Sequence, residues 1–286
     1  MAITNFIPEV WAAAIAESLK KSLVYGNVSN RDYEGDIAQK GDTVHITGVQ
    51  DLTIGDYVKG TDITVEAATD RNAATLTIDQ AKYFAFEADD VDKRQAAGDF
   101  VTAFSTQAAY QLADVADQYI AGVMAGAAAN KLADVATTEP EKAYDTLVDL
   151  AVALDKSNTP SVGRWVVVTP EFYGLLRKDT RFVAGSENAN ATLLNGQIGT
   201  AAGFAVLESN NAPAANSKAT KAAAGDLGNV IIAGSPVATT FAEQINSVEA
   251  ARKEKGFADV IKGLHLYGAT VVRPDALAVV NFKVGA

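Results

Sequence analysis

The sequence predicts an α+β protein, and three patterns along the chain support this class. Residues 41–87 alternate polar and apolar side chains with a period of two, which is typical of short β-strands. Residues 99–126 carry apolar side chains with a period close to 3.6, which predicts one long helix. After residue 136, helical and strand patterns are mixed, so helices are expected to pack on a sheet there.

The N-terminal residues predict a short amphipathic helix. Pro8 suits a first helical turn, and four apolar residues recur every four positions: Ile7, Trp11, Ile15 and Leu19. Glu9 and Glu17 interrupt the apolar stretch, which argues against a signal peptide and a membrane span. Two packings of this helix remain open, one on its own domain and one on a neighbouring subunit.

Four short strands are predicted next, at residues 43–47, 62–65, 74–78 and 83–87. The span between them is hydrophilic, with few large apolar side chains, so it can bury little surface alone. A lone two-stranded hairpin is at best marginally stable in water. We therefore expect a long, projecting hairpin that needs a partner surface.

The longest helical pattern follows the acidic residues of 88–92. Its apolar positions are Val101, Phe104, Ala108, Leu112, Val115, Tyr119 and Val123. A helix from Asp99 to Gly126 would be about 42 Å long at 1.5 Å per residue. Because this length exceeds most compact domains, the helix is expected to act as a strut.

The remaining residues predict a mixed region of helices and strands. A helix is expected over 139–157, with Pro140 near its start. Thr169 and Pro170 provide an N-cap and a first-turn proline for a helix over 170–178. Strands are expected at 165–168, 204–209 and 229–234, with a polar, alanine-rich loop at 210–226 and a charged loop at 253–263 before the closing strands.

Composition excludes several classes of function. The net charge is −11, from 24 basic and 35 acidic residues, whereas a nucleic-acid-binding protein needs Lys and Arg to neutralise phosphates. Sequence-specific nucleic-acid binding is therefore not expected. The chain contains no cysteine, which rules out disulfides and thiolate metal sites.

Three glycines, Gly196, Gly199 and Gly203, crowd one short span, but they do not form a phosphate-binding loop. A P-loop requires Lys and Ser or Thr directly after the last glycine, whereas Phe204 follows here. The dinucleotide fingerprint requires a strand before the glycines and a helix after them, and here a strand follows. The span is therefore interpreted as tight turns that need positive φ angles.

No residue pattern indicates catalysis. The two histidines, His45 and His265, lie in strand-like stretches and are interpreted as strand residues that face solvent or a polar partner. The acidic pair 89–90 caps and solvates a helix, whereas Glu249 and Glu254 belong to a charged loop. With neither H-E-x-x-H nor G-x-S-x-G spacing, we expect no catalytic residue, cofactor, metal site or enzyme activity.

Three stretches carry a resemblance to a known family: 165–182, 196–213 and 247–282. The first runs from a strand through a proline-started helix to Arg181, the second turns through glycines into a strand that ends near Ser209, and the third has a charged loop, Arg273-Pro274 and a final strand. With the arm, hairpin and strut helix before them, they make the chain resemble the major capsid proteins of tailed bacteriophages (Caudovirales).

That resemblance implies the Hong Kong 97-like capsid fold: an N-terminal arm, an extended β-hairpin loop, a long spine helix in a peripheral domain, and an α/β axial domain. The implied division is 1–36 for the arm, 37–88 for the extended loop and flanking strands, 89–135 for the peripheral domain with the spine helix, 136–235 for the axial domain, and 236–286 for peripheral-domain strands with the charged loop and closing strand.

The resemblance also implies contacts between copies of the chain. Candidate interface residues are Trp11, Lys59, Arg252, Lys253, Glu254 and Lys255. Axial loops would meet at five- and six-fold positions, and the charged loop near three-fold positions. Some relatives join subunits through a Lys–Asn bond, but no Asn follows Phe257 closely, so no such cross-link is expected, although Lys59 is expected near the hairpin tip.

The expected partners are other copies, in hexamers and pentamers of an icosahedral shell, together with a separate scaffolding protein, a portal protein and, as an optional addition, a decoration protein. A separate scaffold is expected because the arm begins almost at Met1. The shell would enclose double-stranded DNA without sequence-specific binding or a membrane, within a virion assembled in the host bacterial cytoplasm.

Three other readings remain open. An encapsulin-type nanocompartment shell would share the fold and enclose an enzyme instead of DNA. An α/β nucleotide-binding enzyme would use the glycine span. A decoration or tail protein would be another virion component, although such proteins usually lack a strut helix after a long hairpin.

Overall fold

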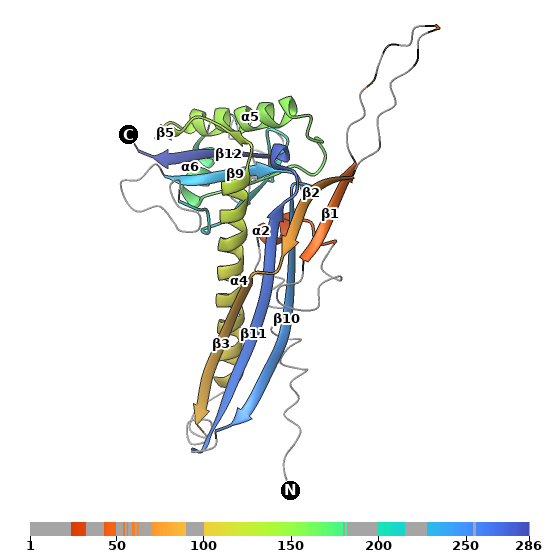
Figure 1. The fold of residues 1–286 in the computed structure, drawn as a ribbon. Helices are drawn as coiled ribbons and strands as arrows, with labels where there is room; N and C mark the ends of the chain where they lie inside the picture. The colour runs from red at the N-terminus through yellow and green to blue at the C-terminus, as the bar shows by residue number, and fades with distance from the viewer. Residues whose placement is uncertain are drawn as a thin grey trace.

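Helix α4 (Phe100–Ala127) is the longest helix and connects two sheets, as Figure 1 shows. The computed structural model describes residues 24–32, 43–49, 54, 56, 59–60, 62, 70–89, 100–179, 181, 199–214, 228–253 and 256–285. The helix confirms the predicted strut to within one residue at each end. Its 28 residues correspond to about 42 Å.

A three-stranded antiparallel sheet lies along α4, in the order β10-β11-β3. Its strands are β10 (Thr239–Arg252), β11 (Ala258–Val271) and β3 (Gln80–Asp89). The predicted charged loop over 253–263 is therefore wrong in extent, because pairing of β10 with β11 resumes at Ala258. Glu249, which the sequence also predicts in a charged loop, lies within β10 opposite Lys262. Cross-strand pairing of opposite charges allows these polar residues to form strands.

A hairpin crosses the face of this sheet that points away from α4. It consists of β1 (Thr43–Val49) and β2 (Asp70–Thr77), which pair antiparallel. Its base packs through Ile46, Leu76 and Ile78 on Ala242 and Leu266 of the sheet. Among the described residues β1 and β2 pair only with each other, as a two-stranded sheet. The strand predicted at 62–65 lies outside the described residues apart from Asp62.

The second sheet has seven strands, with the path β4-β12-β9-β6-β8-β7 and with β5 also paired to β12. The strands are β4 (Asn130–Lys131), β5 (Val135–Thr137), β6 (Trp165–Val168), β7 (Thr200–Ala201), β8 (Phe204–Glu208), β9 (Asn229–Gly234) and β12 (Leu277–Val284). The predicted division grouped the closing strand with the peripheral strands of 236–286, but β12 pairs with β9. The run Leu277–Val280 is buried, which requires neighbours on both faces of the strand.

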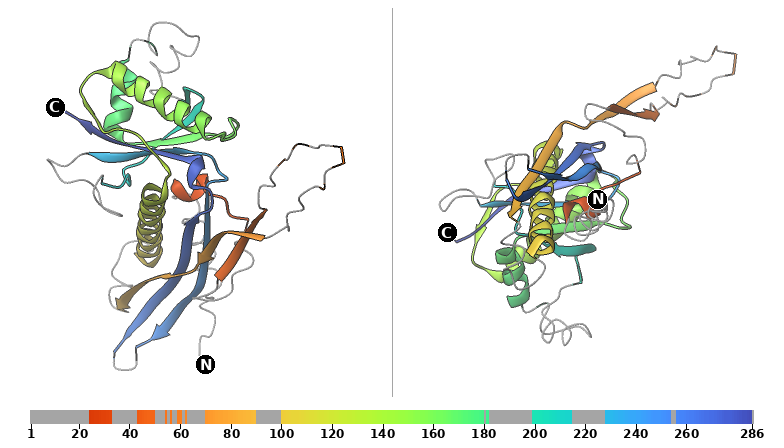
Figure 2. Two further views of the ribbon diagram at one scale, coloured as in Figure 1. Left: turned by 45° about the horizontal axis from the view of Figure 1, so that its top comes forward. Right: turned by 90° about the horizontal axis from the view of Figure 1, so that it is seen from below.

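The seven-stranded sheet is covered on both faces. Helices α5 (Pro140–Lys156) and α6 (Pro170–Lys178) cover one face, where Leu147, Leu150 and Phe172 are fully buried. The C-terminal part of α4 covers the other face with Ile120 and Met124. Figure 2 shows the two helices and α4 on opposite sides of the sheet.

Two short elements complete the fold. Helix α2 (Tyr25–Val28) packs on α4, and the 3₁₀ turn η2 (Pro274–Ala276) precedes β12. Asn30, just after α2, forms a parallel bridge with Thr240 at the start of β10. The predicted N-terminal helix, including Trp11, lies outside the described residues.

The span of glycines forms a tight hairpin turn between β7 and β8. Ala202 and Gly203 are its two central residues, and their φ angles are +49° and +83°. Positive φ at both central positions is characteristic of a type I′ turn, whose twist suits a β-hairpin. The prediction of a turn that needs positive φ is therefore confirmed for Gly203. Gly199 has no such angle, and Gly196 lies outside the described residues.

Gly203→Ala is expected to lower the free energy of unfolding by about 1–2 kcal/mol, because an L-residue is strained in the left-handed region. Gly199→Ala is the matched control. A Cβ at position 199 would meet no atom within 4 Å, and the backbone of Gly199 does not have a positive φ. Urea unfolding of both variants measures the difference. Equal stability of the two would contradict a φ requirement at position 203.

Candidate functional site

The free end of the three-stranded sheet carries paired charges on neighbouring strands. The guanidinium of Arg252 lies 3.1 Å from a carboxylate oxygen of Asp259. Lys253 Nζ lies 2.8 Å from both carboxylate oxygens of Glu87. A third pair, Lys262 with Glu249, is also 2.8 Å apart. Because these pairs are exposed, each contributes at most about 1 kcal/mol to folding.

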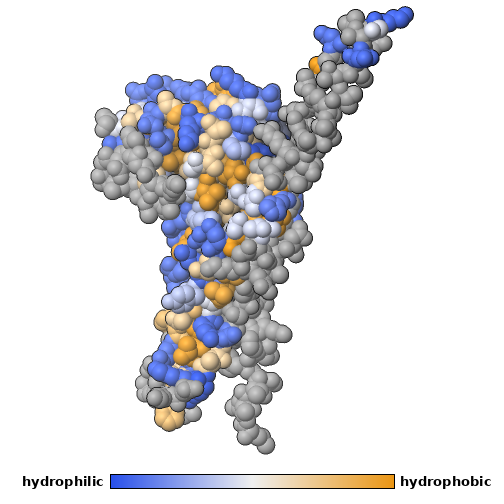
Figure 3. All heavy atoms as spheres, viewed as in Figure 1, coloured by the Kyte–Doolittle hydropathy of each residue, from blue (hydrophilic) through white to orange (hydrophobic). Residues whose placement is uncertain are grey.

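Phe257 lies beside these charges, in the connection between β10 and β11. Its side chain is 78% exposed, although a large aromatic side chain is usually at least half-buried in a folded protein. An exposed aromatic residue within a ring of charged residues is typical of a protein contact surface. Figure 3 shows that hydrophobic residues are also exposed at intervals between hydrophilic ones along the viewed face.

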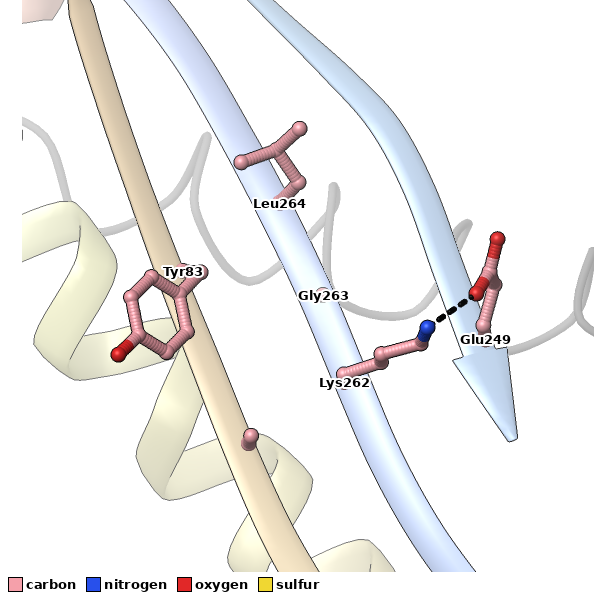
Figure 4. Close-up of a pocket in the computed structure, with 6 residues that line it drawn as sticks. Tyr83, Glu249, Lys262, Gly263 and Leu264 are labelled. Atoms are coloured by element: carbon pink, nitrogen blue, oxygen red, sulfur yellow. Dashed lines mark ion pairs between the residues drawn. The ribbon is translucent and has the colours of Figure 1, made fainter. Parts of the chain in front are cut away.

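A shallow hollow of about 380 Å³ lies on the face of the sheet that points away from α4. Figure 4 shows Tyr83 of β3 on one side of it and the Lys262–Glu249 ion pair on the other. Ala85, Gly263 and Leu264 complete the lining. The lining contains a single ion pair and no nucleophile beside a base.

The β1–β2 hairpin presents a further exposed surface. Ile54 is 96% exposed, and Lys59 forms a turn with Gly60, whose φ is +92°. A branched apolar side chain this exposed loses the hydrophobic stabilisation of about 1.5–3 kcal/mol that burial would supply. Burial of Ile54 against another surface would therefore be favourable.

A buried ionic group fixes the segment after α2 to the three-stranded sheet. Glu243 of β10 accepts a hydrogen bond from Arg31, and its second carboxylate oxygen lies 3.3 Å from Nε2 of His265 on β11. Burial alone would raise the pKa of Glu243, but His265 and Arg31 outweigh it and hold that pKa below its usual value. His265 is thus a strand residue with a polar partner, as predicted, and the exposed His45 contacts Thr75.

Glu243→Gln is expected to lower the free energy of unfolding at neutral pH by about 1–3 kcal/mol, since Arg31 loses its buried charged partner. With a lowered folded-state pKa, the carboxylate stabilises the fold above its ordinary pKa, and this contribution disappears as pH falls through the folded-state pKa. Denaturant unfolding should therefore show a large difference in the free energy of unfolding between wild type and variant at neutral pH, and this difference should disappear in acid. A difference in the free energy of unfolding that does not change with pH would contradict a stabilising role for the ionised carboxylate of Glu243.

A second buried carboxylate, Asp117 of α4, joins three separate elements. Its Oδ1 accepts hydrogen bonds of 2.9 and 2.8 Å from the backbone nitrogens of Val24 and Tyr25, at the start of α2. Its Oδ2 accepts a 3.1 Å bond from the side-chain amide of Asn211, in the turn after β8. Burial raises the pKa of Asp117 although these bonds oppose the shift. The residue therefore holds the N-terminal segment and the seven-stranded sheet against one point of α4.

Arg181 follows α6 and ties it to α5. Its guanidinium donates to the fully buried Asp179, to Asp145 at 3.0 Å and to the backbone oxygen of Glu141 at 2.6 Å, and it stacks over the ring of Tyr144. Burial raises the pKa of Asp179, but the bonds from Arg181 hold it below its ordinary value. Arg181, which belongs to one stretch of the resemblance, therefore has a structural role.

The predicted interface residues fall into separate places. Arg252 and Lys253 lie together at the free end of the sheet, whereas Lys59 lies in the hairpin turn. Trp11, Glu254 and Lys255 lie outside the described residues. No local sequence pattern distinguishes Asp117 or Tyr83, because the burial of Asp117 and the exposure of Tyr83 depend on tertiary packing.

The described residues contain no group of three or more potential ligands placed to hold a metal ion. None of the described helices is long and apolar enough to cross a membrane.

Comparisons with known proteins give a consistent result. A family model described as "Phage capsid protein" matches residues 72–280. A structure from Mycobacterium phage Che8 is similar with a TM-score of 0.77 and 35% identity, covering 91% of each chain. The capsid structure of the cyanophage P-SCSP1u has a TM-score of 0.71 and 18% identity, covering 86% of this chain and 85% of that one. The mature capsid of bacteriophage PhiM1 has a TM-score of 0.66 and 18% identity, covering 91% and 87%. No curated protein matches the chain.

Proposed function

The chain belongs to the phage capsid protein family and is a major capsid protein with the Hong Kong 97-like fold, and we propose that its copies form hexamers and pentamers that close into an icosahedral head around double-stranded DNA. Membership in this family implies that the chain associates with itself into a shell and that it resides in the virion. A structural role also fits the absence of catalytic motifs from the sequence.

The β1–β2 hairpin is the observation that carries the proposed assembly. Its base is anchored on the sheet through Leu76 and Ile78, while Ile54 farther along is almost fully exposed. A hairpin that pairs with no third strand among the described residues gains stability by lying on another subunit. We infer that it reaches across a neighbour in the shell.

The free end of the three-stranded sheet supports a second contact between copies. Arg252, Lys253 and Phe257 lie there, and we propose that they meet the same end of neighbouring copies near three-fold positions. Lys59, Trp11, Glu254 and Lys255 remain proposed interface residues. No cross-link through Lys59 is proposed, because no Asn closely follows Phe257.

We propose a division into domains that follows the predicted boundaries: an arm at 1–36, an extended loop at 37–88, a peripheral domain at 89–135 continued at 236–286, and an axial domain at 136–235. In this proposal β12 is reassigned to the axial sheet, with which it pairs. A scaffolding protein, a portal protein and an optional decoration protein are the proposed partners, and assembly takes place in the host cytoplasm. The negative charge of −11 limits adhesion of the wall to DNA.

Electron microscopy of the chain expressed in bacteria, with and without the products of neighbouring genes, tests this proposal. The expected result is closed icosahedral particles of uniform size when a scaffolding protein is present, and irregular particles without it. Uniform, closed shells from the chain alone would exclude the separate scaffold. A strictly monomeric, ligand-binding protein would overturn the assembly itself.

The contents of the particles separate the proposed function from its alternative. Nuclease-protected DNA in particles from infected cells supports a phage head, whereas an enclosed enzyme would support an encapsulin-type nanocompartment. The match to phage capsid proteins over residues 72–280 favours the first. The α/β nucleotide-binding enzyme lacks support, because the glycine span forms a turn between two strands.

A further inference from the structure

A joint of two residues connects the β1–β2 hairpin to the three-stranded sheet. β2 ends at Thr77 and β3 begins at Gln80, so Ile78 and Asp79 join strands of two different sheets. Figure 1 shows β3 following β2 across this joint. At 3.4 Å per residue the 8 residues of β2 span about 27 Å, so a turn of about 10° at the joint moves the far end by about 5 Å. The direction of the hairpin therefore depends on how the joint is held.

The two residues of the joint are held from different sides. Ile78 is buried with Leu266 and Ala242 at the base of the hairpin. Asp79 is exposed, and its Oδ1 accepts a hydrogen bond of 3.0 Å from the hydroxyl of Tyr119, which lies 40 residues farther along the chain in α4. Successive side chains of an extended chain point to opposite faces, which allows this arrangement. The sheet thus holds one residue of the joint, and the helix holds the other.

Tyr119 is fixed on α4 by the packing of its ring. The ring stands edge-on to that of Tyr267 on β11, with 5.5 Å between the centroids and 70° between the planes. The side chain of Gln80 also hydrogen-bonds the Tyr119 hydroxyl. Burial raises the pKa of Tyr119, and the charge of Asp79 raises it further, so the hydroxyl stays protonated at neutral pH and can donate. Tyr119 therefore contacts both the joint and the first residue of β3.

We propose that Tyr119 and Asp79 are positioning residues for assembly, which set the direction of the β1–β2 hairpin relative to α4. An exposed hydrogen bond contributes little to the stability of the fold. A tenfold preference for one hairpin direction requires only 1.4 kcal/mol, so the same bond is strong enough to select a direction. The step from the direction of the hairpin to the yield of shells rests on the proposed function.

The distance between two spin labels tests the proposal in the unassembled full chain. The chain contains no cysteine, so Asp62→Cys in the hairpin and Gln107→Cys on α4, both at exposed positions, provide unique labelling sites. Tyr119→Phe and Asp79→Ala are each expected to shift or widen the distance distribution by about 5 Å, which corresponds to the turn of about 10° at the joint. Tyr110→Phe is the matched control, because it removes the hydroxyl of an exposed tyrosine from the same helix.

The yield of closed shells measures the consequence for assembly, in chains without the labels. Tyr119→Phe is expected to lower this yield by about tenfold, while the melting temperature of the unassembled chain stays close to that of wild type. Asp79→Asn should retain most of the yield, because its amide oxygen can still accept from Tyr119. The double variant of Tyr119→Phe with Asp79→Ala should lose no more than either single variant, since both remove the same bond.

Label distances that are unchanged in both Tyr119→Phe and Asp79→Ala would overturn the proposal, whatever happens to the melting temperature. Additive losses of shell yield in the double variant would overturn it as well, because the two residues would then act separately. Failure of the wild-type chain to form any shell would count against the proposed function instead, and the label distances would still decide whether Tyr119 sets the direction of the hairpin.

Discussion

Gly268→Ala is expected to displace the base of the β1–β2 hairpin and to lower the free energy of unfolding by about 3 kcal/mol, near the upper end of overpacking costs. A Cβ at position 268 of β11 would lie 2.2 Å from the backbone oxygen of Thr77 and 3.1 Å from Cα of Ile78. Rotating a side chain cannot relieve a collision with backbone, so the hairpin must move. The contact of Ile78 with Leu266 is then lost.

The yield of assembled shells should fall more than the stability of the fold, because the hairpin would extend from the three-stranded sheet in a different direction. Urea unfolding measures the first effect, and particle counts by electron microscopy measure the second. Gly126→Ala is the matched control: it lies in the last turn of α4 with no atom within 4 Å of its Cβ, so it should not lower the free energy of unfolding. Normal shells from Gly268→Ala would contradict a fixed hairpin direction.

Asp117→Ala is expected to destabilise the fold by about 2–4 kcal/mol, because it leaves one buried and two part-buried donors without an acceptor. Two of these donors are the backbone nitrogens of Val24 and Tyr25, and the third is the side chain of Asn211. Release of the N-terminal segment should follow, which limited proteolysis detects as faster cleavage before residue 24. Thermal unfolding gives the loss of stability.

Asp117→Asn separates hydrogen bonding from charge. Its amide oxygen can still accept the two backbone bonds, while its NH₂ faces the amide of Asn211, so the expected loss is about 1–2 kcal/mol. The buried negative charge is also removed, which favours folding. Equal losses for the alanine and asparagine variants would show that the charge, and not the bonding, holds the N-terminal segment.

Local patterns predicted the helices well. The apolar period of 99–126 lies within one residue of α4, and Thr169 with Pro170 marked the start of α6, where the Thr169 hydroxyl caps the helix by accepting from the nitrogen of Phe172. These signals act within one or two turns of the chain, so they can be recognised without knowledge of the fold. The order of arm, hairpin and strut helix, together with the stretches 165–182, 196–213 and 247–282, carried the resemblance to the family.

Features that depend on distant pairing were missed. The charged residues Asp259 and Lys262 indicated a loop, yet they lie in β11 because Arg252 and Glu249 face them across the ladder. In the sequence Asp117 cannot be distinguished from other acidic residues of the helix, because its role depends on its contact with α2.

One core runs through both sheets. Ile120 and Met124 of α4 belong to the same buried cluster as Val167 of β6 and Ile261 of β11. Because both sheets share this cluster, melting of one is expected to remove packing from the other, and heat should unfold the chain in one cooperative transition, with equal calorimetric and van't Hoff enthalpies. A subunit of this kind responds to heat as a single thermodynamic unit, and a fragment cut between its two sheets would retain neither of them.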